Sequence, residues 1–221
     1  MQTAEVIRLF GKRAKRKPIK SLDSLKYFTE PQIKLLRRTV RNHAELDLKK
    51  GKVTGLREWM AVDLLTCSGL RVSEVSNLRC GDLKLGYGES KIFVRNGKGS
   101  ISGHVVIPES LKRHLKSFIK WKLERGEPTG KDDHVFIGQR GFWTVQAIQQ
   151  LTKKYLKALN LYEPGKSVHA LRHSYGVALY RKERDVRAVQ KQLRHRSISS
   201  TAIYADVTEE DLQGQVKGLW G

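Results

Sequence analysis

The stretch VHALRHSYGVALY, residues 168–180, decides how this sequence is interpreted. It places His169, Arg172 and His173 within one short helical segment. Residues three positions apart on a helix lie on nearly the same face, so His169 and Arg172 can reach one target. Ser167 is placed to cap this helix, which puts both side chains near free backbone N–H groups and the positive end of the helix dipole. The segment is therefore suited to binding a phosphate.

Two other interpretations fit this segment when it is considered alone. His169 and His173 are four residues apart, as zinc ligands often are, but no HExxH motif is present and no carboxylate lies between them. A metal therefore ranks below a phosphate. In the second interpretation His169 is a core histidine and Arg172 forms a surface ion pair. Without further motifs, this structural interpretation is favoured.

The charge of the chain indicates a polyanionic partner. Among 221 residues, 43 are Lys or Arg and 22 are Asp or Glu, which gives a formal net charge of +21. Such a field attracts nucleic acid first, ahead of an anionic membrane surface. No apolar run of about 18 residues is present, so no transmembrane span is expected. Cys67 and Cys80 form no CxxC motif and no signal peptide is visible, which predicts a cytoplasmic protein with reduced thiols.

The apolar periodicity predicts a mainly helical fold with one small antiparallel β-sheet, an α+β class. Helices are expected over 28–50, 56–69, 72–78, 111–126, 143–159, 168–182, 186–193, 197–204 and 208–220. A capping box of Thr29 and Gln32 starts the first of them. Short strands are expected in 82–86, 91–96 and 102–108, and GKGSI (97–101) joins the last two as a β-hairpin. Residues 132–138 are expected to be extended.

Residues 1–24 are expected to form a flexible basic arm. GKRAKRKPIK (11–20) has six cationic residues in ten positions and no apolar period, so we expect it to become ordered only on phosphate. A nuclear-localisation signal is the alternative and would require a eukaryotic host. The residues expected to bind DNA in this arm are Lys12, Arg13, Lys15, Arg16, Lys17 and Lys20.

TCSGLRVSEVSNLR (66–79) places a second arginine at a rigid corner. Gly69 ends one helix and Arg71 opens the next, with Glu74 three residues later on the same helical face. A guanidinium there can grip two phosphate oxygens in a fork that lysine cannot match. The alternative is a helix-initiating arginine that merely pairs with Glu74.

LRHRSISSTAIYADV (193–207) adds His195 and, nine residues later, Tyr204. A single tyrosine in such a place is most often a half-buried core residue. The order of the motifs argues otherwise, because Arg71, the hairpin lysine Lys98, the 169–172 pair, His195 and Tyr204 must all be explained together.

In this order the motifs resemble those of the tyrosine recombinase, or phage integrase, family. The matching blocks are TCSGLRVSEVSNLR, the lysine in RNGKGS, HALRHSYG and LRHRSISSTAIYADV. They cover roughly residues 27–207, so the resemblance implies a tyrosine recombinase catalytic domain over 25–207.

The resemblance implies that Tyr204 attacks the scissile DNA phosphate and forms a 3′-phosphotyrosyl link. Arg71 and Arg172 resemble the pair that binds the non-bridging oxygens. The chemistry agrees, because a phenol is a poor nucleophile at neutral pH and needs a phosphate whose charge is already neutralised. Two arginines can do this without a metal, and no cofactor is implied.

The remaining site residues receive supporting roles from the same resemblance. His169 and His195 resemble the hydrogen-bonding partners of the phosphate. Lys98 resembles the general acid that protonates the 5′-hydroxyl leaving group. Glu74 matches a position that steadies the site.

Three features depart from the family pattern. Arg194 precedes His195, where relatives usually have glycine, and it is expected to bend the turn or add a phosphate contact. Tyr204 is followed by Ala-Asp, which we expect to be harmless. Only the short arm precedes the catalytic domain, so we expect a naturally single-domain recombinase, similar in size to fimbrial-switch invertases. A fragment of a longer chain is the alternative.

The expected function is site-specific DNA recombination, with integration, excision and inversion left open. A homo-tetramer on two double-stranded DNA duplexes and accessory DNA-bending proteins are the implied partners. The expected C-terminal helix (208–221) carries Leu212, Val216 and Leu219 on one stripe. The resemblance implies that this stripe docks on a neighbouring subunit, and packing on its own chain is the alternative. The alternatives are a type IB topoisomerase-like nicking-closing enzyme and a non-catalytic nucleic-acid-binding protein.

Overall fold

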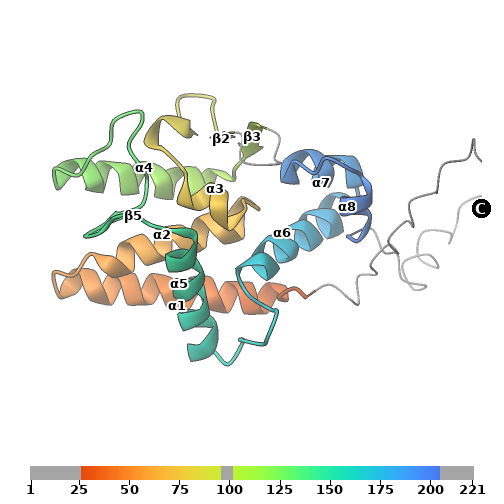
Figure 1. The fold of residues 1–221 in the computed structure, drawn as a ribbon, viewed down its shortest axis with the longest axis horizontal. Helices are drawn as coiled ribbons and strands as arrows, with labels where there is room; N and C mark the ends of the chain where they lie inside the picture. The colour runs from red at the N-terminus through yellow and green to blue at the C-terminus, as the bar shows by residue number, and fades with distance from the viewer. Residues whose placement is uncertain (1–25, 96–101, 205–221) are drawn as a thin grey trace, which may run out of the picture.

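The computed structural model describes residues 26–95 and 102–204, and it is mainly helical with small antiparallel sheets (Figure 1). This confirms the predicted α+β class. The helices are α1 (Glu30–Lys49), α2 (Thr54–Cys67), α3 (Val72–Ser76), α4 (Glu109–Glu124), α5 (Val145–Ala158), α6 (Val168–Glu183), α7 (Val186–Leu193) and α8 (Ser199–Ala202), with a 3-10 turn η3 at Cys80–Asp82. No helix in these ranges is both long enough and apolar enough to cross a membrane.

Helix α2 forms the centre of the fold because it is apolar around most of its circumference. Met60, Ala61, Val62, Leu64 and Leu65 are each at most 1% exposed. The helix packs against α1, α4, α5 and α6, and α1 lies alongside it in Figure 1. A helix that is apolar on all sides belongs in a core, and this one organises the elements around it.

Helix α1 covers one side of α2 with a single apolar face. Leu36, Val40 and Ala44 follow each other at intervals of four residues and are buried. At the start of the helix the Thr29 backbone N–H donates a hydrogen bond to Gln32 Oε1 at 2.9 Å, as the capping-box pattern predicts.

The three predicted strands form one antiparallel sheet in the order β1 (Leu83–Lys84), β2 (Lys91–Val94) and β3 (Gly103–Val106). Ile92 pairs with Val105, which confirms the antiparallel pairing of the predicted hairpin. The connection between β2 and β3, residues 97–101, lies outside the described residues.

The prediction of a single sheet is wrong. A second antiparallel pair joins β4 (Ile137–Gly138) and β5 (Gly141–Phe142). Each strand has only two residues, too few to show the alternation by which strands are recognised. Gly141, with a φ of +98°, provides the left-handed residue of the tight turn.

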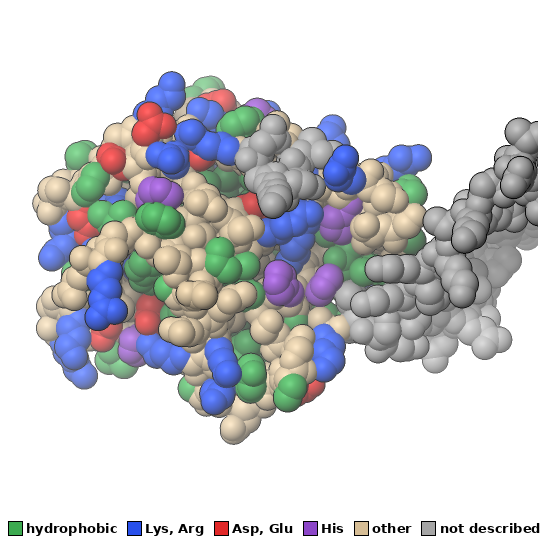
Figure 2. Space-filling view, in the orientation of Figure 1, with side chains coloured by type: hydrophobic (Ala, Val, Ile, Leu, Met, Phe, Trp, Pro, Cys, Tyr) green, Lys and Arg blue, Asp and Glu red, His purple; other side chains and the backbone are tan. Residues whose placement is uncertain are grey.

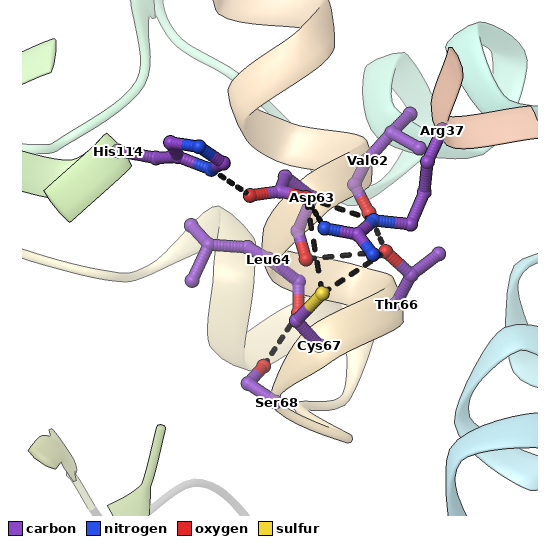
Figure 3. A network of polar contacts seen from close by, with 8 residues as sticks. All are labelled: Arg37, Val62, Asp63, Leu64, Thr66, Cys67, Ser68 and His114. Carbon is purple, nitrogen blue, oxygen red and sulfur yellow. Dashed lines mark hydrogen bonds and ion pairs between the residues drawn. The ribbon is translucent and has the colours of Figure 1, made fainter. Parts of the chain in front are cut away.

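A buried polar network ties α1, α2 and α4 together (Figure 3). Asp63 on α2 is 1% exposed. Its Oδ1 accepts from Arg37 Nε at 3.0 Å and Nη2 at 2.7 Å, and its Oδ2 lies 2.8 Å from His114 Nδ1. Cys67 lies beside the same carboxylate, and burial raises the pKa of its thiol to about 11. The network fixes α2 relative to both neighbouring helices.

The C-terminal helices enclose a second, smaller core. Val177 and Tyr180 of α6, Val189 and Leu193 of α7, and Tyr204 just beyond α8 pack together there. Figure 1 shows α6, α7 and α8 gathered at one end of the molecule. Helix α8 is a single turn, shorter than the predicted 197–204.

Candidate functional site

Gly69 forms the corner between α2 and α3 and fixes the position of Arg71. Its φ is +67°, a left-handed value that glycine adopts without strain. A Cβ at this position would lie 2.6 Å from Tyr175 Cδ1 and 2.8 Å from Leu193 Cδ2. Because α6 and α7 approach so closely, the corner holds the start of α3 directly against them.

Arg71 is the N-cap residue of α3 and is oriented by Glu74. The Arg71 backbone N–H donates to Glu74 Oε2 at 2.7 Å, and its Nη1 donates to Oε1 at 3.0 Å. The Glu74 side chain is 7% exposed and that of Arg71 is 34% exposed. The carboxylate is therefore internal, while the guanidinium reaches the surface with N–H donors left for a ligand.

Arg172 on α6 is buried and held between two helix ends. Its Nη1 donates to the Gly69 carbonyl oxygen at 2.5 Å, and its Nη2 donates to the Leu193 carbonyl oxygen at 2.5 Å. Burial first, and then the positive charges of Arg71 and Arg194, lower its pKa to about 10. The guanidinium is thus still cationic at neutral pH, so the site holds a fixed positive charge below its surface. The alternative interpretation of Arg172 as a partner in a surface ion pair is therefore wrong.

His195 follows α7 and is neutral at physiological pH. Burial and the charges of Arg172 and Arg71 lower its pKa to about 4. Its Nδ1 lies 2.8 Å from Thr201 Oγ1 on α8. A Thr201 hydroxyl that donates to Nδ1 leaves the ring proton on Nε2, from which it can be donated to an oxygen in the site.

Tyr204 is packed inside the second core with its hydroxyl beside a base. The residue is 2% exposed, and its OH lies 2.9 Å from His173 Nδ1. Burial raises the pKa of the phenol to about 12, against the opposing effect of Arg172 and Arg71. Gly176 leaves the space for the ring, because a Cβ there would lie 2.8 Å from Tyr204 Cζ.

The predicted site residues do not all meet in the structure. Arg71, Glu74, Arg172, His195 and Tyr204 come together from α3, α6, the end of α7 and the residues after α8. Figure 2 shows histidine and cationic side chains gathered on the face over α6.

His169 lies at the start of α6 and is exposed, so the alternative of a core histidine is wrong. Among the described residues no hydrogen bond or ion pair joins it to the rest of the site. Lys98, the six arm residues and the 208–221 helix lie outside the described residues, so their roles stay predictions.

Two residues of the site, His173 and Gly176, carry no role in the sequence-based assignment, and a third, Arg194, is expected there only to bend the turn or add a phosphate contact. His173 stands in the 168–180 stretch, where its spacing suggests only a metal. Gly176 lies inside a helix, a position that usually has a packing reason. Arg194 departs from the family pattern, and the sequence does not reveal where its side chain points. In the structure this side chain is 5% exposed, and its Nη2 lies 2.6 Å from Glu74 Oε2.

Solved structures with the same fold are catalytic regions of recombinases. A crystal structure of XerA recombinase matches with a TM-score of 0.68 at 26% identity, over 88% of this chain and 65% of that one. The XerH site-specific recombinase bound to its difH substrate matches with a TM-score of 0.71 at 22% identity, over 93% of this chain and 57% of that one. The fold is therefore that of tyrosine recombinase catalytic domains.

Residues 26–211 match the phage integrase family, and the chain belongs to it. The tyrosine recombinase XerD of Ralstonia nicotianae is 35% identical over 72% of this chain and 51% of its own length. The tyrosine recombinase XerA of Thermococcus kodakarensis is 32% identical over 72% of this chain and 54% of its own. The chain thus spans about half the length of the curated relatives that it matches.

Proposed function

We propose that this chain is a site-specific recombinase that cuts and rejoins DNA strands through a 3′-phosphotyrosyl intermediate. The observation that carries the proposal is the meeting of Tyr204 with the residues around His195: the two rings stack with 6.2 Å between their centroids, and the charges of Arg71 and Arg172 act on the Tyr204 phenol. Family membership and the likeness to recombinase structures support the same chemistry.

The two arginines prepare the phosphate. A DNA phosphodiester repels a nucleophile through its negative charge, and charge accumulates further in the transition state. Arg172 provides a buried cation and Arg71 an accessible one with donors still available. The neutral His195 adds a hydrogen-bond donor whose position is fixed by Thr201.

Tyr204 provides the nucleophile, and His173 is the nearest base to it. With a pKa of about 12 the phenol remains protonated at neutral pH, so its proton must be removed during the attack. His173 Nδ1, 2.9 Å away, accepts that proton. Because Tyr204 is only 2% exposed, the residues that cover the phenol must move apart before a phosphate of bound DNA can meet it beside His173.

The cleavage step then balances. A bond forms between the Tyr204 oxygen and phosphorus, and the bond from phosphorus to the 5′ oxygen breaks. In our proposal Lys98 gives this leaving oxygen its proton, and His169 contacts the phosphate from the start of α6. The phosphotyrosyl link keeps the energy of the broken bond, so rejoining needs no ATP.

The proposal extends to partners and domains. Residues 1–24 are a DNA-binding arm, and residues 25–207 are the catalytic domain. Residues 208–221 are a helix that docks on a neighbouring subunit of a tetramer on two duplexes.

An apolar groove of about 530 Å³ lies between the start of α1 and α6, and Ile33, Tyr175 and Val177 are among the residues that line it. This groove suits the apolar stripe of the 208–221 helix. Accessory DNA-bending proteins would assist assembly, in the cytoplasm.

Covalent capture tests the function and selects the recombination site in the same experiment. The chain is incubated with a library of nicked duplexes of random sequence. Cleavage near the nick releases a short strand fragment that diffuses away, so the covalent adduct cannot be rejoined and accumulates. We expect protein–DNA adducts that survive denaturation and share a sequence. The Tyr204→Phe variant should bind DNA through its cationic contacts and form no adduct.

Two results would contradict the proposal. An equal yield of adducts with Tyr204→Phe would mean that another of the seven tyrosines is the nucleophile. No adduct from the unaltered chain would mean that it does not cleave DNA in this form. Joining of strands between two captured duplexes separates strand exchange from topoisomerase-like nicking and closing.

A further inference from the structure

Arg194 has a backbone conformation that its side chain does not favour. It is the residue after α7, with φ +51° and ψ +49°, the left-handed region in which glycine is the usual helix-ending residue. Arginine is strained there. The strained backbone needs a compensating contact, and that contact lies in the site.

The Arg194 side chain turns inward to the carboxylate that orients Arg71. Its Nη2 lies 2.6 Å from Glu74 Oε2, and its side chain is 5% exposed. Its Cδ would lie 3.5 Å from a Cβ at Gly103, so the stem also packs against the start of β3. Within the described residues none of its three guanidinium nitrogens has an aligned hydrogen-bond partner. The contact is therefore mainly one of charge.

Charges around Glu74 show what this contact changes. Burial alone would raise the pKa of Glu74, but Arg194 and Arg71 together lower it, so the carboxylate is ionised. An ionised Glu74 paired with Arg71 alone would cancel most of the positive field of Arg71 at short range. With Arg194 as a second counter-ion, three guanidiniums surround one carboxylate.

We propose that Arg194 is a positioning residue that balances the charge of Glu74 and so leaves the charge of Arg71 available to the scissile phosphate. This inference rests on the proposed function. The site then carries a net charge of about +2 from these four side chains, which matches the doubly negative transition state of phosphodiester cleavage. Glycine, the usual residue of the family pattern at this position, has no side chain with which to perform this role.

Arg194→Gly removes the side chain and keeps the backbone, since glycine favours the left-handed conformation. The matched control is Arg184→Gly at the end of α6, where φ is +53° and the residue is exposed. Both variants remove one positive charge and one strained arginine. On a duplex captured by the unaltered chain, we expect Arg194→Gly to cleave about tenfold more slowly or worse, and Arg184→Gly to cleave at the normal rate.

A neutral phosphate distinguishes a charge effect from a structural one. If the scissile phosphate is replaced by a methylphosphonate, one negative charge is lost and less positive field is needed. The loss of cleavage rate caused by Arg194→Gly should then be severalfold smaller on the methylphosphonate than on the natural phosphate. The loss should also be smaller when Arg194→Gly is made in a Glu74→Gln background. A normal rate for Arg194→Gly, or an equal defect on both phosphates, would overturn the proposal.

Thermal unfolding without DNA tests the pair even if no DNA is captured. In Glu74→Gln, Arg194 is left buried without its counter-ion. Arg194→Gly should therefore lower Tm less, or even raise it, in the Glu74→Gln background. The change in Tm caused by Arg194→Gly should differ between the two backgrounds by about 2–4 °C. The effect of Arg184→Gly should be the same in both. Additive effects of Arg194→Gly and Glu74→Gln would overturn the pairing, whatever the chain does to DNA.

Discussion

His195 is neutral because burial and neighbouring arginines oppose a further positive charge. A neutral imidazole can donate to a phosphate oxygen without adding to the repulsion among Arg71 and Arg172. Its low pKa also makes the folded chain less stable in acid, because the unfolded chain binds a proton at this residue more readily than the folded chain does.

The first prediction concerns the pH dependence of stability. The pKa of His195 is about 4 in the folded chain, below its ordinary value of 6.5, so between these values the unfolded chain binds more protons. Stability from this residue is present above 6.5 and is lost as pH falls toward 4. In His195→Gln, which can still bond Thr201, the drop in Tm over that range should be smaller. An equal drop in both proteins would mean that His195 titrates normally.

At the scale of residues, the identity and order of the site residues could be predicted from the sequence better than the contacts between their side chains. Arg71 and Glu74 could be paired from their spacing on one helix. Arg194 could not be assigned, because its direction depends on a left-handed turn that sequence patterns associate with glycine. The partner of Tyr204, His173, is 31 residues away in the sequence, and no local pattern joins the two.

Helix α2 depends on its polar network as well as on its apolar surface. Asp63 holds Arg37 of α1 and His114 of α4 from a position that is 1% exposed. A buried carboxylate of this kind is favourable only while both partners remain, since each is drawn out of water.

We expect Asp63→Asn to destabilise the fold by about 2–4 kcal/mol, because it leaves Arg37 without a counter-ion and removes the acceptor of His114. Glu45→Gln is the matched control: its ion pair with Arg41 spans 3.1 Å on α1 and both side chains are more than half exposed. That change should cost about 0.5 kcal/mol or less. Urea denaturation measures both, and similar small losses would show that the network contributes little.

Elements with a clear apolar pattern were predicted from the sequence, and the pairing of the second sheet was not. α7 has its predicted bounds, since Asp185 caps it and its apolar face is clear. β4 and β5 have two residues each, and their pairing depends on the turn between them and not on any pattern within them. The Asp63 network was also missed, because its three members lie on separate helices.

At the scale of the whole molecule, the net charge of +21 is the property most accessible from sequence, and six of its cations lie within residues 11–20. If these cations neutralise DNA phosphates, they release condensed counter-ions, and each contributes about 0.9 to the slope of log affinity against log salt concentration. Replacing all six by glutamine should therefore weaken binding and reduce that slope by up to about 5 units.

The matched control for this prediction is a chain in which residues 11–20 are shuffled. Shuffling keeps every charge, so an electrostatic arm should retain both the affinity and the salt dependence of the natural sequence. Binding to the captured duplex is measured by titration at several salt concentrations. If shuffling weakens binding as much as neutralisation does, the arm recognises DNA through a specific order of contacts. An unchanged slope after neutralisation would show that these six residues do not bind phosphate, and that the affinity comes from residues outside the arm.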